Sequence, residues 1–95
     1  MYTVVYHRRV IKDLKRVDKK VAYTILNKII PLLIKEPSAV GIRLTGVLSA
    51  FYKYLFSIQG VLYRIIYKLI HKENTVWIPF IGSRENIYSR LLRQL

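Results

Sequence analysis

The chain has 95 residues and no cysteine, which predicts a single domain over residues 1–95 and excludes disulfides, thiolate metal sites and cysteine nucleophiles. Seventeen lysines and arginines outnumber five aspartates and glutamates, and the resulting net charge of +12 predicts a polyanionic partner, either nucleic acid or an acidic protein. No charged segment followed by an apolar one opens the chain, so we expect a cytoplasmic protein.

The first part of the chain is predicted to form one strand and two helices. The β-branched and aromatic residues of Tyr2–Tyr6 favour a strand. Apolar residues then recur at helical spacing, first over 10–17 and again over 21–33. Asp18 is a suitable N-cap for the second helix, and Pro31 should kink this helix or end its regular hydrogen bonding one turn earlier. Two amphipathic helices joined by a tight turn predict an αα-hairpin.

The second part of the chain is predicted to form three strands and a last helix. Alternating apolar residues predict strands at Ala50–Ile58, Val61–Ile70 and Val76–Ile81. Pro79 lacks an N–H, which predicts an edge position, a bulge or an early end to pairing. Ser83 is the predicted N-cap of a helix that continues to the end of the chain.

This element order, β-α-α-β-β-β-α, predicts an α+β fold. The simplest way to bury the apolar faces is a four-stranded, mostly antiparallel sheet with the αα-hairpin on one face. The opposite face would stay partly open beside the C-terminal helix. The apolar stripe of that helix is expected at Ile87, Leu91 and Leu95.

One stretch, Leu44–Tyr63, carries a single charge and is long enough to span a membrane. Gly46 and Gly60 interrupt it with turn signals, and its aromatic residues fall at every second position. We therefore expect strands here and no membrane span.

The residues available for chemistry are mainly arginine, lysine and tyrosine. The carboxylates and the two histidines are scattered along the chain, which predicts no metal site and no cofactor. RNA supplies its own nucleophile, the 2′-OH, so a protein that cleaves RNA need only position the phosphate, stabilise charge and move protons. If the chain is an enzyme, this residue set favours RNA over DNA as its substrate.

Strand and helix periodicity predicts which of these side chains can meet. Arg64 and Lys68 share a face of their strand, and Lys53 lies on one face of the preceding strand. Arg84 and Tyr88 are four residues apart and would project from one side of the predicted last helix. Taken singly, each of these residues is common on a surface or in half-buried packing, so their value lies in their order along the chain.

Four motifs occur in a particular order. They are Leu44-Thr45-Gly46, then Tyr52-Lys53, then Gly60-Val61-Leu62-Tyr63-Arg64-Ile65-Ile66-Tyr67, then Ile81-Gly82-Ser83-Arg84-Glu85-Asn86-Ile87-Tyr88. This order resembles the RelE-type toxins of the RelE/ParE superfamily over nearly the whole chain. Two departures stand out: Leu55 occupies the position of a second lysine in RelE, and the turn before Tyr63-Arg64 is longer.

The resemblance implies a ribosome-dependent, metal-independent endoribonuclease that cleaves mRNA by attack of the 2′-OH. Lys53 and Arg64 would hold the scissile phosphate, Arg84 would stabilise charge and protonate the leaving 5′ oxygen, and Tyr88 would deprotonate the 2′-OH. Further basic residues are expected to bind the substrate or the ribosome: Lys12, Lys15, Arg16, Lys19 and Lys68. Lys68 could also replace the missing second lysine.

The resemblance also implies a partner, a small antitoxin that is acidic in its toxin-binding half and forms a hetero-oligomer with this chain. Two other functions remain open at this point. One is a ParE-like toxin that binds and inhibits DNA gyrase without RNase activity, and the other is an RNA-binding module that performs no chemistry. ParE-type chains generally lack the terminal arginine and tyrosine, so Arg84 and Tyr88 favour the endoribonuclease.

Overall fold

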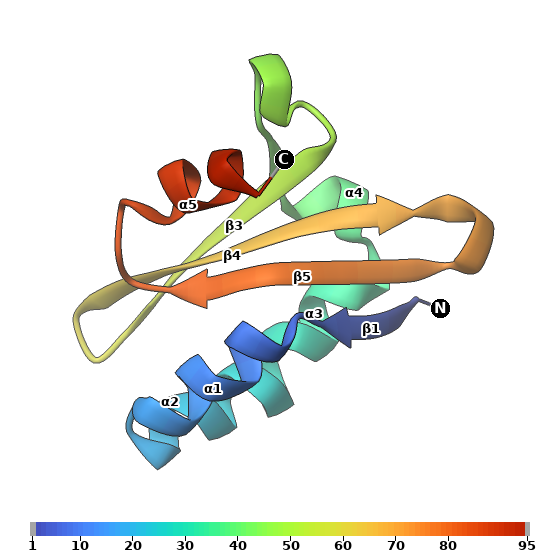
Figure 1. Ribbon diagram of the computed structural model, residues 1–95. Coiled ribbons are helices and arrows are strands. Elements are labelled where there is room, and N and C mark those ends of the chain that lie inside the picture. The colour runs from blue at the N-terminus through green and yellow to red at the C-terminus, as the bar shows by residue number, and fades with distance from the viewer. Residues whose placement is uncertain (1, 95) are drawn as a thin grey trace.

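A mixed five-stranded sheet forms the centre of the computed structural model, which describes residues 2–94 (Figure 1). The spatial order is β1-β5-β4-β3-β2, in which β1 runs parallel to β5 and the other neighbours are antiparallel. The strands are β1 (Thr3–Tyr6), β2 (Ile42–Arg43), β3 (Phe51–Ile58), β4 (Val61–Ile70) and β5 (Thr75–Gly82). The predicted count of four was wrong because β2 has only two residues, too few to show an alternating pattern.

Pro79 lies in β5, an interior strand between β1 and β4, and of the three predicted alternatives the structure shows the bulge. Ile66 of β4 pairs with Phe80, and Lys68 pairs with Trp77, so the register shifts between these two pairs. Two residues of β5, one of them Pro79, thus oppose a single residue of β4. The bulge leaves the proline nitrogen outside the ladder, where its missing N–H costs no hydrogen bond.

The predicted αα-hairpin is present, and Asp18 and Pro31 cap and interrupt its second helix as expected. The side chain of Asp18 accepts a hydrogen bond from the backbone N–H of Lys20 at 2.7 Å, which caps the second helix. A π-helical turn ends at Ile29, two residues before Pro31, because the proline has no N–H with which to continue the regular hydrogen bonding. The segments are α1 (Arg8–Arg16), α2 (Lys19–Thr24), the π-helical turn (Ile25–Ile29), α3 (Ile30–Lys35) and α4 (Pro37–Val40).

The two faces of the sheet carry separate apolar clusters. Helices α1 to α3 cover one face, and α5 (Ile87–Arg93) lies on the other, as Figure 1 shows. The cluster under the hairpin includes Val10, Val21, Ile25, Leu33, Ile65 and Ile78. The cluster under α5 consists of Leu48, Phe51, Ile66, Phe80, Ile87 and Leu91. The second face is covered over only part of its length, since Leu55 and Leu62 remain exposed there.

The last helix begins later than predicted. It starts at Ile87 with Asn86 as its N-cap, and Ser83 belongs to the loop between β5 and α5. The Ser83 carbonyl accepts a hydrogen bond from Arg64, a tertiary contact that ties this loop to β4. The predicted shared helix side of Arg84 and Tyr88 was therefore wrong. Leu95, the third residue of the expected apolar stripe, lies outside the described residues.

Tyr67 ties the sheet to α4. Its hydroxyl donates a hydrogen bond to the Pro37 carbonyl at 2.6 Å, and burial raises the pKa of this Tyr67 hydroxyl well above its ordinary value. A Cβ on Gly41 would lie 1.9 Å from the same hydroxyl oxygen, so only glycine allows this close approach.

The expectation of strands within Leu44–Tyr63 is confirmed by β3. No helix within residues 2–94 combines the length and apolar character that crossing a membrane requires.

Candidate functional site

Arg64 fixes the loop that follows β5. Its side chain is 12% exposed, and its Nη1 donates to the Ser83 carbonyl at 2.9 Å. Its Nη2 lies 3.9 Å from Oε1 of Glu85, whose side chain is 90% exposed, so this ion pair is weak and screened by water. The hydrogen bond to Ser83 is thus the stronger of the two contacts that link Arg64 to the loop.

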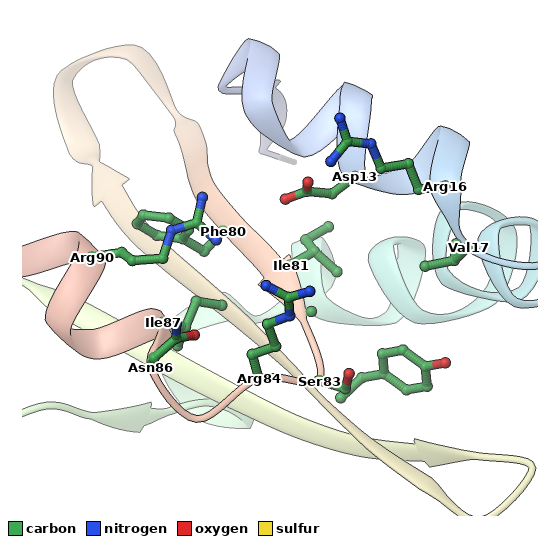
Figure 2. A pocket seen from close by; sticks show the side chains of 12 residues that line it. Asp13, Arg16, Val17, Phe80, Ile81, Ser83, Arg84, Asn86, Ile87 and Arg90 are labelled. Carbon is green, nitrogen blue, oxygen red and sulfur yellow. The ribbon is translucent and has the colours of Figure 1, made fainter.

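Arg84 lies in this loop and lines a pocket of about 430 Å³ (Figure 2). Arg16 from α1 and Arg90 from α5 line the same pocket, so three guanidinium groups from three separate elements surround one hollow. Within the described part of the chain, the one ion pair shorter than 4.0 Å is that of Arg64 with Glu85. Asp13 also lines the pocket but forms no ion pair within 4.0 Å with any described residue, so the three guanidiniums outnumber the one carboxylate and the pocket should attract anions.

Lys53 and Tyr88 lie on the same side of the sheet as Arg64 but outside the lining of this pocket. Lys53, on β3, pairs with Ile66 of β4, which places it diagonally across from Arg64 and on the same face. Tyr88, on α5, packs against the apolar cluster beneath that helix. The structure thus joins Arg64 to the loop that carries Arg84, and it places Lys53 and Tyr88 on the same face of the sheet as Arg64.

The basic residues predicted to bind RNA separate into three groups. Arg16 lines the pocket beside Arg84, and Lys12 lines a neighbouring one. Lys15 and Lys19 are exposed and line neither. Lys68 lies over the ring of Phe51, with 5.9 Å between its Nζ and the ring centroid, so part of its role is packing.

Arg9 and Arg90 are two residues that sequence spacing does not single out. Their guanidinium groups lie 4.9 Å and 5.5 Å from the ring centroid of Phe80, a residue of β5. The only sequence signal was their charge, because the two arginines meet through the packing of α1 and α5 on the sheet. Among residues 2–94, no three histidine or carboxylate side chains come together to hold a metal ion.

Comparisons with known proteins agree with the motif order and the fold. The model of the ParE-like toxins of type II bacterial toxin–antitoxin systems matches residues 4–92. A chain of the RelBE2 toxin–antitoxin complex from Mycobacterium tuberculosis has a TM-score of 0.72 at 24% identity, covering 87% of this chain and 98% of that one. The isolated E. coli RelE toxin has a TM-score of 0.68 at 20% identity, covering 99% and 98% of the two chains.

A third solved structure extends the likeness to archaea. A chain of the RelE–RelB complex from Pyrococcus horikoshii has a TM-score of 0.61 at 23% identity, covering 88% of this chain and 96% of that one. No curated protein sequence matches significantly. The three solved structures share the fold of this chain at low sequence identity, and the family model matches nearly all of the sequence. This chain belongs to the ParE-like toxins of type II bacterial toxin–antitoxin systems.

Proposed function

We propose that this toxin is a ribosome-dependent, metal-independent endoribonuclease that cleaves mRNA in the cytoplasm. The observation that carries the proposal is the hydrogen bond from Arg64 to Ser83, which holds Arg84 beside Arg16 and Arg90 in an anion-attracting pocket. Such a group of guanidiniums around one pocket can stabilise the charge that develops on a phosphate during cleavage. Arginine is suited to this role, and the protein need not supply a nucleophile because the 2′-OH of the RNA is the nucleophile.

In the proposed reaction, the 2′ oxygen of one nucleotide attacks the adjacent phosphorus and the bond from phosphorus to the 5′ oxygen breaks. The products are a 2′,3′-cyclic phosphate and a 5′-hydroxyl. Tyr88, as its phenolate, takes the proton of the 2′-OH and becomes the neutral phenol, while the Arg84 guanidinium delivers a proton to the leaving 5′ oxygen and becomes the neutral guanidine. Lys53 and Arg64 contribute positive charge on the face of the sheet that carries both groups. Each group therefore has one role, and proton gain and loss balance.

The proposed partners are a cognate antitoxin, the ribosome and mRNA. Two of the solved relatives are toxin–antitoxin complexes, from Mycobacterium tuberculosis and Pyrococcus horikoshii. With a net charge of +12, this chain would be steered toward an antitoxin segment that is acidic, and the two would form a hetero-oligomer. A co-purified neighbour that is basic, or that binds without suppressing toxicity, would contradict this partner.

The test of the reaction is cleavage of an mRNA on purified ribosomes in EDTA, with both product ends identified. Cleavage should continue, leave a 2′,3′-cyclic phosphate and a 5′-hydroxyl, and stop when a hydrogen replaces the attacking 2′-OH. Arg84→Ala and Tyr88→Phe should each lower the single-turnover rate by about 10²–10⁴-fold with little loss of ribosome affinity. Tyr88→Phe keeps the ring in the apolar cluster, so a near-wild-type rate for this variant would leave Tyr88 a packing residue.

A second function is favoured by the matching family model, which is that of the ParE-like toxins. In this case the chain would bind and inhibit DNA gyrase and would not cleave RNA. Intact mRNA together with gyrase-dependent DNA breaks in cells that express the toxin would establish the second function and reject the first.

A further inference from the structure

A second pocket, of about 370 Å³, lies next to the one that contains Arg84. Its cationic lining comes from α1 and α5 and consists of Arg8, Arg9, Lys12, Arg16 and Arg90. Asp13 is the one carboxylate that lines it. The balance of charge at the pocket is therefore strongly positive, as in sites that bind phosphate groups.

Two of these cations are held in place by the fold. Arg9 and Arg90 come from different helices, and their guanidiniums lie 4.9 Å and 5.5 Å from the centroid of the same Phe80 ring. That ring is 1% exposed, so it cannot move to separate them. In the amide orientation that satisfies its hydrogen bonding, the Gln94 side-chain carbonyl accepts from the Arg9 guanidinium, but neither arginine has a carboxylate within 4.0 Å among residues 2–94, so their positive charges repel one another at this pocket. An anion between them would relieve this repulsion.

The two pockets form one groove, since both are lined by Asp13, Arg16 and Arg90. A strand of RNA carries a phosphate on every nucleotide, so a strand whose scissile phosphate lies beside Arg84 has neighbouring phosphates within reach of the second pocket. We infer that the second pocket binds a backbone phosphate of the same RNA strand and sets the direction of that strand between α1 and α5. This inference rests on the proposed function for the identity of the strand.

A variant of Asp13 should strengthen RNA binding, whereas loss of a lining cation should weaken it. Its carboxylate lines both pockets and would repel a phosphate in either of them. Asp13→Asn keeps the size of the side chain and removes the negative charge. If the groove holds RNA phosphates, this variant should bind RNA several-fold more tightly than the wild type.

The experiment measures binding of a short fluorescent single-stranded RNA to the whole toxin over a range of salt concentrations, without ribosomes. Arg8→Ala/Lys12→Ala removes two exposed lining cations, whereas Lys28→Ala/Lys35→Ala removes two exposed cations that line neither pocket. If these lining cations neutralise the one backbone phosphate held in the second pocket, the slope of log K against log salt should fall by about 0.7 for the first variant, the value for one phosphate no longer neutralised. The matched control should change the slope much less, and both variants should unfold at the wild-type temperature.

Equal effects of the two double variants, or weaker binding by Asp13→Asn, would overturn the inference and leave the pocket a solvated surface. Complete displacement of the RNA by an equimolar amount of inorganic phosphate would also overturn it, by showing a site for a free anion. Because no step of this assay needs cleavage, it separates the two proposals. A toxin that leaves mRNA intact on ribosomes but still shows the predicted slope difference would refute the endoribonuclease and retain the groove.

Discussion

Arg64→Lys tests whether catalysis depends on the conformation of the loop or only on positive charge at β4. The substitution keeps the charge and removes the guanidinium whose Nη1 donates to Ser83 at 2.9 Å. A hydrogen bond from a charged group contributes about 1.5–3 kcal/mol, and the donor side chain of Arg64 is 12% exposed although Ser83 lies at the surface. If the bond holds Arg84 in its reactive position, its loss should lower the cleavage rate constant by about 10- to 150-fold.

The assay is single-turnover cleavage of mRNA on ribosomes, with toxin–ribosome affinity measured separately. Arg64→Ala removes the charge as well and should be slower than Arg64→Lys. Glu85→Gln is the matched control, because the Glu85 carboxylate is 90% exposed and 3.9 Å from Arg64, so its rate should stay close to wild type. A wild-type rate for Arg64→Lys would refute the reasoning, since charge alone would then be sufficient.

Three further predictions concern stability and ribosome binding. Gly41→Ala places a Cβ against the buried Tyr67 hydroxyl and should lower the free energy of unfolding by about 3 kcal/mol. An unchanged midpoint of urea unfolding would contradict this close approach. Burial raises the pKa of Tyr67 above its value in the unfolded chain, so the free energy of unfolding should fall as pH rises above about 10. This fall should be less steep in Tyr67→Phe, and an equal pH dependence of the unfolding free energy in the two proteins, measured by urea titration, would contradict the prediction. Replacing a set of basic residues by alanine should flatten the salt dependence of ribosome binding, and an unchanged slope would show that these residues are only solvated. That set is Lys12, Lys15, Arg16 and Lys19.

The parts of the fold that the sequence predicted well are those governed by local chemistry. The strand Val61–Ile70 has the bounds that alternation predicts, because one face packs under the hairpin and the other under α5. Asp18 caps its helix through a hydrogen bond two residues along the chain. Pro31 disturbs the turn before it for reasons contained in its own ring. In each case the interaction that decides the structure lies within a few residues.

The parts that were predicted wrongly depend on contacts between distant residues. β2 exists because two residues pair with Tyr52 and Lys53 of β3, and two residues show no periodicity. The predicted helix start at Ser83 was locally reasonable, since serine is a good N-cap. The hydrogen bond from Arg64, 19 residues away, uses the Ser83 carbonyl in the observed loop. Tertiary contacts therefore overrode the local preference at both places.

The same distinction explains which residues of the candidate site were found. Arg64, Arg84 and Tyr88 were recognised through their order along the chain, which is visible in any sequence. Arg9 and Arg90 belong to helices at opposite ends of the chain and on opposite faces of the sheet, and they meet only because each reaches the ring of Phe80. Phe80 follows the bulge at Pro79, which brings it to the face under α5, so the position of this ring depends on one irregularity of β5. The position of this groove depends on the register of the sheet and on no sequence motif. Its positive charge could therefore be predicted from the composition, whereas its position could not.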